Sequence, residues 1–133
     1  MSTKEQLLDA AKSIRDNSYS PYSNYKVACA AVTDDGKVFT GVNVENASYG
    51  GTNCAERSAI FTAVSEGQRH FKEFLVLVDE VEPWAPCGLC RQVMLEFSSP
   101  DTKVYLANLD GVKTELTMKE LFPYTFSKSQ LKK

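Results

Sequence analysis

Three cysteines in two short segments constrain the fold of this chain more than any other feature. Residues 54–57 read Cys-Ala-Glu-Arg, and residues 86–92 read Pro-Cys-Gly-Leu-Cys-Arg-Gln. Each segment follows a loop and begins a predicted helix, where the helix dipole and free N–H groups stabilise thiolates. If Cys54, Cys87 and Cys90 bind one cation, two helix N-termini that are distant in the sequence must lie side by side.

The hydrophobic pattern predicts an α/β fold around these segments. Turn signals at Asp34-Asp35-Gly36 and Asp110-Gly111 leave no room for crossover helices, so the first two and the last two strands are expected to be antiparallel. The element order predicts a three-layer α/β/α sandwich with a mixed five-stranded sheet. The predicted helices span residues 3–17, 54–65, 87–97 and 116–121, and the strands span 27–33, 37–44, 73–79, 103–107 and 112–116.

Length and composition limit the classes of protein that fit. The 133 residues suit a single domain, here residues 1–133, and the net charge of −2 argues against a nucleic-acid partner. The N-terminus has no apolar signal region, and no apolar run approaches the ~20 residues of a membrane span. We therefore expect a cytoplasmic protein with no membrane partner. In that compartment, four cysteines indicate thiols or metal ligands more than disulfides.

Three cysteine ligands predict a catalytic zinc site. Structural zinc sites are closed by four protein ligands, whereas three leave a position for water, whose pKa zinc can bring to about 7. Glu56 is two residues from Cys54 and could reach the open face without ligating, so it is the candidate proton shuttle. Arg57 lies beside the site and could offset the charge of three thiolates by hydrogen bonding to sulfur.

Other interpretations of the cysteines are weaker. A structural zinc site usually has two Cys-x-x-Cys pairs, and only one is present. A redox Cys-x-x-Cys lacks a thioredoxin-like context. Cys29 lies in an apolar predicted strand, so a small buried residue is expected there in preference to a fourth ligand.

The paired motifs match the zinc deaminase pattern, in which His-x-Glu or Cys-x-Glu precedes Pro-Cys-x-x-Cys. Further blocks resemble the homotetrameric cytidine deaminases, the three-cysteine type of the cytidine and deoxycytidylate deaminase family. The matching blocks run in family order from about residue 20 to residue 126. They are Ser20-Pro21-Tyr22-Ser23, Gly41 to Ala47, Cys54 to Arg57, Pro86 to Gln92, and Leu121-Phe122-Pro123 with Phe126.

The resemblance implies a role for each matching residue. Asn43 and Glu45 would bind the ribose hydroxyls, and Phe126 would stack on the pyrimidine from a neighbouring subunit. Tyr25 would pack near the base, whose edge would be read by the N–H of Ala55 and the carbonyl of Ala85. Arg57 would hydrogen-bond the thiolates. The implied assembly is a homotetramer with shared active sites, Zn²⁺ as cofactor and a small nucleoside as substrate.

Two segments depart from the family pattern. Val27-Ala28-Cys29-Ala30 replaces Val-Gly-Ala-Ala, which bears on the close packing of that strand. Ala85-Pro86-Cys87 replaces Ser-Pro-Cys, a mild change if only the backbone carbonyl of residue 85 is used.

The implied reaction is the hydrolytic deamination of cytidine and 2′-deoxycytidine by zinc-activated water, in pyrimidine salvage. The alternatives are deamination of a related nucleoside or nucleoside antibiotic, and a non-catalytic zinc- or nucleoside-binding module, against which an intact Glu56 argues. The expected hairpin at Asp110-Gly111 argues against the nucleic-acid deaminases, which usually place a helix there.

Overall fold

A computed structural model describes residues 3–131, and the predicted domain of residues 1–133 includes two residues at each end outside that range. None of the helices within residues 3–131 has the length and apolar character that a membrane-spanning helix requires. The α-helices are α1 (Thr3–Ile14), α2 (Ala55–Ser65), α3 (Gly88–Glu96) and α4 (Met118–Leu121), and short 3-10 helices are η1 (Arg15–Asn17), η2 (Tyr49–Gly51) and η3 (Lys128–Leu131). The strands are β1 (Val27–Thr33), β2 (Val38–Val42), β3 (Phe71–Val78), β4 (Lys103–Asn108) and β5 (Gly111–Thr117).

The strands form one mixed sheet in the order β2-β1-β3-β4-β5, which confirms the predicted sheet. The β1–β2 and β4–β5 pairs are antiparallel hairpins, as their turn residues predict. β1 also pairs antiparallel with β3, whereas β3 and β4 are parallel. The parallel pair needs a crossover connection, and α3 lies within it.

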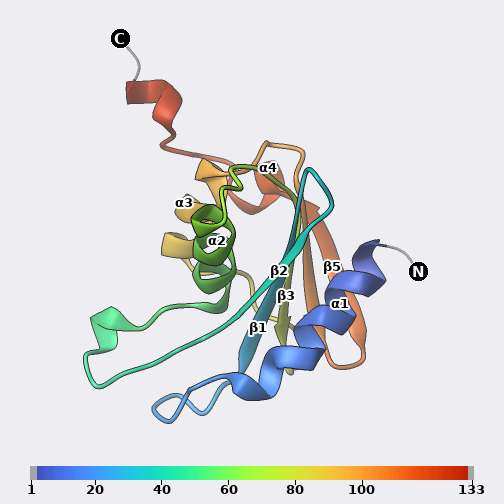
Figure 1. Cartoon of the computed structure of the whole chain (residues 1–133), viewed down its shortest axis with the longest axis vertical. Helices are drawn as coiled ribbons and strands as arrows, with labels where there is room; N and C mark the ends of the chain where they lie inside the picture. The colour runs from blue at the N-terminus through green and yellow to red at the C-terminus, as the bar shows by residue number, and fades with distance from the viewer. Residues whose placement is uncertain (1–2, 132–133) are drawn as a thin grey trace.

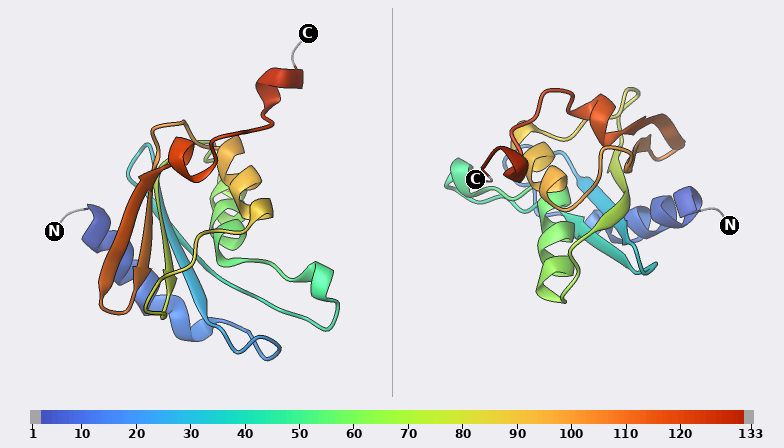
Figure 2. Two further views of the ribbon diagram at one scale, coloured as in Figure 1. Left: turned by 180° about the vertical axis from the view of Figure 1, so that it is seen from behind. Right: turned by 90° about the horizontal axis from the view of Figure 1, so that it is seen from above.

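Helices cover both faces of the sheet and give the predicted three layers (Figures 1 and 2). Side chains of β1 alternate between the faces: Ala28, Ala30 and Val32 pack under α1, whereas Ala31 packs in the core beneath α2 and α3. β3 is buried on both faces, as its continuous apolar run predicts. α2 and α3 lie side by side on the same face, with α1 on the opposite one (Figures 1 and 2).

The helix and strand ends differ from the predicted ends by a few residues. α1 ends at Ile14 and continues as the 3-10 helix η1, and β3 begins at Phe71, two residues earlier than predicted. Gly67 ends α2 as predicted: its φ of 94° is a left-handed conformation that glycine adopts without strain, and its N–H donates to Val64 O at 3.0 Å.

Gly41 in β2 permits a close approach between the sheet and the beginning of α2. A Cβ atom at this position would lie 2.5 Å from Ala59 N and 2.6 Å from Ala55 O. Cys29 is opposite Gly41 on β1 and is fully buried against Ala55 and Ala59. The departure from the family pattern at Cys29 therefore leaves a tightly packed strand, and α2 is seated directly on the sheet.

Candidate active site

Two helix N-termini bring three thiols together. Cys54 and Cys87 are the N-cap residues of α2 and α3, both have extended backbone conformations, and neither thiol caps its helix. Cys90 is fully buried in the first turn of α3. The three Sγ atoms lie within 4.8 Å of one another, with 3.8 Å between those of Cys54 and Cys87. The structure thus places the three predicted ligands around one point.

The electrostatics of the thiol cluster fit a cation. The hydrogen bond from Cys90, with further ones from Arg57 and Cys87, lowers the pKa of Cys54 to about 5. The same hydrogen bond to Cys54, together with burial and nearby negative charge, raises the pKa of Cys90 far above its ordinary value. Cys54 is therefore stable as a thiolate, whereas Cys90 requires positive charge nearby to lose its proton. A bound divalent ion supplies this charge and deprotonates coordinating thiols.

Arg57 provides part of the compensating charge from within the chain. Its Nη2 donates to Cys54 Sγ at 3.5 Å and to the carbonyl of Thr52 at 3.3 Å. The hydrogen bond to Cys54 is the largest of the effects that raise the pKa of Arg57. The guanidinium lies directly against the sulfur, as the sequence suggested.

Glu56 is buried in the first turn of α2, with 3% of its surface exposed. Burial raises the pKa of Glu56 to about 7, and the negative charge of Cys54 acts in the same direction. A carboxyl group with a pKa near 7 can both accept and release a proton at neutral pH. The geometry places this group beside the thiol cluster, in the wall of the same cavity.

Cys54, Cys87 and Glu56 line a cavity of about 240 Å³. The cavity wall includes both predicted sugar-binding residues and the residues expected near the base. Three predicted site residues, Arg57, Cys90 and Phe126, do not line this cavity. The lining residues are Ser23, Tyr25, Val27, Asn43, Glu45, Thr52, Cys54, Ala55, Glu56, Val76, Val78, Trp84, Ala85 and Cys87.

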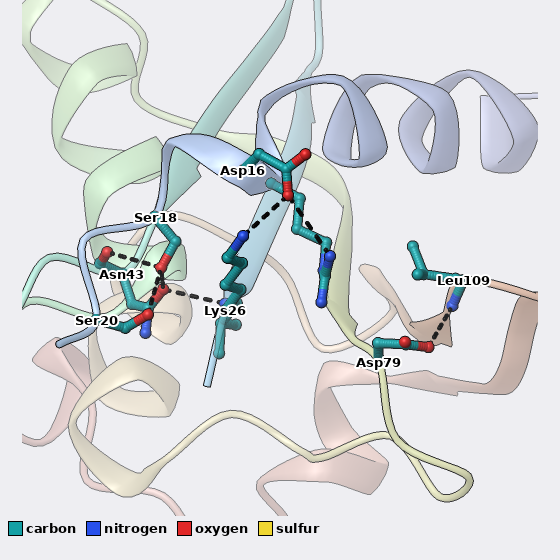
Figure 3. A network of polar contacts seen from close by, with 9 residues as sticks. Asp16, Ser18, Ser20, Lys26, Asn43, Asp79 and Leu109 are labelled. Carbon is teal, nitrogen blue, oxygen red and sulfur yellow. Dashed lines mark hydrogen bonds and ion pairs between the residues drawn. The ribbon is translucent and has the colours of Figure 1, made fainter. Parts of the chain in front are cut away.

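Asn43 is 7% exposed and connects the loop that precedes β1 to the end of β2. Its Nδ2 donates to Tyr25 O at 2.8 Å, and its Oδ1 accepts from Val27 N at 3.0 Å and from the Ser18 hydroxyl (Figure 3). Both acceptor positions of Oδ1 are therefore used, and one Nδ2 hydrogen is free of these bonds. Asn43 can offer this hydrogen to a ligand.

Glu45 is also buried, with 8% of its surface exposed. Its Oε1 accepts from the backbone N–H groups of Tyr22 and Ser23, each at 3.0 Å, and its Oε2 accepts from the Ser23 hydroxyl at 2.5 Å. The Ser23 hydroxyl has the largest effect in lowering the pKa of Glu45. An ionised carboxylate has about four acceptor positions, so Glu45 keeps roughly one for a ligand hydroxyl.

The aromatic wall of the cavity contains one residue that the sequence analysis did not identify. The Trp84 ring meets the Tyr25 ring edge-to-face, with 4.6 Å between centroids. Trp84 is the only tryptophan of the chain and lies three residues before Cys87, a signal that could have identified it. Ser23, Val27 and Thr52 were likewise missed, and only the fold brings them to the cavity.

Phe126 and Cys29 both lie away from the cavity, but in different surroundings. Phe126 is 59% exposed and lies on the chain segment that leaves the molecule beyond α4. Cys29 is fully buried beneath α2, and burial raises its pKa. Among residues 3–131, the metal-binding cluster consists of Cys54, Cys87 and Cys90 and does not include Cys29. The structure therefore places Cys29 in the core, as expected from its apolar strand.

Comparisons with known proteins agree with this geometry. Residues 1–107 match the family model of the cytidine and deoxycytidylate deaminase zinc-binding region. The chain is 48% identical over 124 residues to a cytidine deaminase of Halalkalibacterium halodurans, covering 93% of this chain and 94% of that protein. It is 46% identical over 127 residues to one of Sporosarcina psychrophila, covering 96% and 93%. A crystal structure of cytidine deaminase from Burkholderia pseudomallei is similar with a TM-score of 0.88 and 48% identity, covering 95% of this chain and all of that one.

Proposed function

The chain belongs to the cytidine and deoxycytidylate deaminase family, and on that premise we propose that it hydrolyses cytidine and 2′-deoxycytidine to uridine and 2′-deoxyuridine, with release of ammonia. The observation that carries the proposal is the placement of buried Glu56 beside three convergent thiols, in the cavity that also contains Asn43 and Glu45. This cavity combines a metal site, a proton-transfer group and polar groups suited to a sugar.

Cys54, Cys87 and Cys90 would hold Zn²⁺, and Arg57 would offset part of the thiolate charge. When bound, the zinc would supply Lewis-acid chemistry that makes water acidic enough to lose a proton near neutral pH. Glu56 takes one proton from the attacking water and gives it to the ring nitrogen of the base, and then carries the second water proton to the amino group, which leaves as ammonia. Its buried carboxyl group suits both steps because its pKa lies near neutrality.

The substrate is positioned by other groups in the wall of the same cavity. The free Nδ2 hydrogen of Asn43 and the remaining acceptor position of Glu45 bind the sugar hydroxyls. Tyr25 packs near the base, and the Ala55 N–H and the Ala85 carbonyl pair with its polar edge. Ala55 is the first residue of α2, where backbone N–H groups have no partner within the helix.

Phe126 completes the site from a neighbouring subunit in a homotetramer. Its ring is exposed and lies outside the cavity of its own chain, which supports a role in another chain. Light scattering tests the assembly, and a fully active monomer would refute it. Mixing Glu56→Gln and Phe126→Ala subunits tests the shared site: reassembled oligomers should recover activity, because some sites then combine intact Glu56 with intact Phe126.

The proposed setting is pyrimidine salvage in the cytoplasm, with a free nucleoside and not a nucleic acid as substrate. The antiparallel β4–β5 hairpin supports this choice over the nucleic-acid deaminases. A panel of cytidine, 2′-deoxycytidine, related nucleosides and short single-stranded DNA distinguishes the alternatives by turnover. A protein that binds cytidine without turnover would instead be a binding module.

The direct test is the absorbance of cytidine at 280 nm after addition of protein. We expect a decrease that stops when zinc is removed with a chelator and returns when Zn²⁺ is restored. Glu56→Gln is the matched control, because it changes one carboxylate oxygen to an amide nitrogen. No decrease with the zinc-loaded wild-type protein would refute the proposed reaction.

A further inference from the structure

Residues directly after Cys90 bind the C-terminal segment of the same chain. Arg91 Nη1 donates to the carbonyl of Leu121 at 2.7 Å, and its Nε donates to the carbonyl of Pro86 at 2.8 Å. Gln92 Nε2 donates to the carbonyl of Phe126, also at 2.7 Å. α3 therefore carries a thiol ligand in its first turn, and its contact with Phe126 comes from Gln92, two residues after Cys90.

The segment that carries Phe126 has little apolar packing of its own. It passes α3 after α4 and then leaves the body of the molecule (Figures 1 and 2). Tyr124 is 93% exposed and Phe126 is 59% exposed. The hydrogen bonds of Ser127 with Gln130 are local to the segment and do not connect it to the sheet or to α3.

Gln92 provides the contact at Phe126 itself. An ion pair between Glu96 and Lys128 follows on the same face of α3, but it spans 3.8 Å between exposed groups, and such pairs contribute little. A hydrogen bond to the Phe126 carbonyl fixes the main chain at that residue, and thereby the direction in which its side chain leaves the backbone.

We propose that Gln92 is a positioning residue. By binding the main chain of Phe126, it fixes the position from which the Phe126 ring reaches the site of a neighbouring subunit. The inference rests on the proposed function, in which Phe126 stacks on the pyrimidine across an interface. Substrate binding in one subunit then depends on the side-chain amide of Gln92 in another subunit. Gln92 lies on α3, the helix that also supplies Cys87 and Cys90 to its own subunit's site.

The variant Gln92→Glu tests this role with little change in size. The carboxylate cannot donate to the Phe126 carbonyl, so the segment should lose its fixed position. Loss of one such hydrogen bond corresponds to about a three- to tenfold change in a binding constant. We expect KM for cytidine to rise by that factor while kcat stays within twofold, because stacking acts on the ground state and the transition state alike. Gln92→Lys, which restores a donor, should recover much of the loss.

Three measurements separate positioning from a general structural effect. Zinc content and tetramer mass should be unchanged in Gln92→Glu. Gln6→Glu, the same substitution on the exposed part of α1, should have wild-type KM. In a Phe126→Ala background, Gln92→Glu should cause no further rise in KM, since no ring remains to be positioned.

The results distinguish this inference from the proposed function. If Phe126→Ala leaves KM unchanged, stacking by Phe126 is wrong and the inference falls with it. If Phe126→Ala raises KM but Gln92→Glu does not, the stacking stands and the positioning role is refuted. Additive effects of the two substitutions on the free-energy scale would also refute it, because they would show that Gln92 acts independently of Phe126.

Discussion

Val44 and Asn53 exchange both backbone hydrogen bonds, at 2.9 Å in each direction. Val44 lies between Asn43 and Glu45, and Asn53 directly precedes Cys54. This single bridge therefore fixes the distance between the proposed sugar-binding residues and a proposed metal ligand. It also closes the base of the loop that contains η2, so these two groups of cavity residues are held together by the backbone and not by side chains alone.

We predict about one zinc ion per chain, bound by three of the four cysteines. Cys54→Ala should lose most of the zinc, because two remaining thiols give an incomplete site. Cys29→Ala should retain it, since Cys29 packs beneath α2 and outside the cluster. Elemental analysis of gel-filtered protein measures both. Loss of zinc from Cys29→Ala with retention in Cys54→Ala would reverse the assignment.

Glu56→Gln should keep zinc and fold but lose most turnover. Glutamine has nearly the same shape but cannot accept and return a proton, and general acid–base groups typically contribute about 10²–10⁴-fold. The measurement is kcat for cytidine in zinc-replete samples, with circular dichroism and metal content as controls. Activity within a few fold of the wild type would remove Glu56 from the mechanism.

Gly41→Ala should destabilise the protein by about 1–3 kcal/mol and lower its activity. The added methyl group would meet backbone atoms of Ala55 and Ala59 at the beginning of α2, which cannot move without shifting Cys54 and Glu56. Urea unfolding and kcat measure the two effects. Gly50→Ala is the matched control, because no atom lies within 4 Å of the added Cβ. Equal stability of the two variants would mean that α2 is not seated as described.

Glu45 should stabilise the fold in a pH-dependent manner. Its pKa is lowered in the folded protein, first by the Ser23 hydroxyl, so the stabilising contribution is fully present above its unfolded pKa of about 4.3. The contribution is lost as the pH falls through the lower folded pKa. Urea unfolding of wild type and Glu45→Gln between about pH 3 and pH 7 measures it as the difference between the two proteins.

That difference in the free energy of unfolding should be largest near neutral pH and should shrink below about pH 4.3. Comparing two proteins at each pH cancels the pH dependence that they share. A difference that grows on acidification would contradict the role of Ser23 and Tyr22 in holding the ionised carboxylate.

The sequence by itself determined the elements and the chemically reactive part of the site. Cys54, Glu56, Cys87 and Cys90 are close to helix starts, where loop and helix signals in the sequence are strong, and local spacing places their side chains near the N-termini. The hairpins at Asp34-Asp35-Gly36 and Asp110-Gly111 were predictable for the same reason, because a short turn fixes the pairing of adjacent strands. The order of the strands in the sheet was not predicted, because it depends on contacts between distant segments.

Only the tertiary structure decided what else surrounds the cavity. Trp84 reaches it from a loop in which its ring packs against Tyr25, and Ser23 reaches it from a loop bound by Glu45; such contacts leave no periodic pattern in the sequence. Gly41 has no sequence signal for helix packing, yet its missing side chain lets α2 approach the sheet. Phe126 is attached through Gln92, a partner far away in the chain. Local propensities predict segments, whereas the depth of a helix and the walls of a cavity depend on long-range packing.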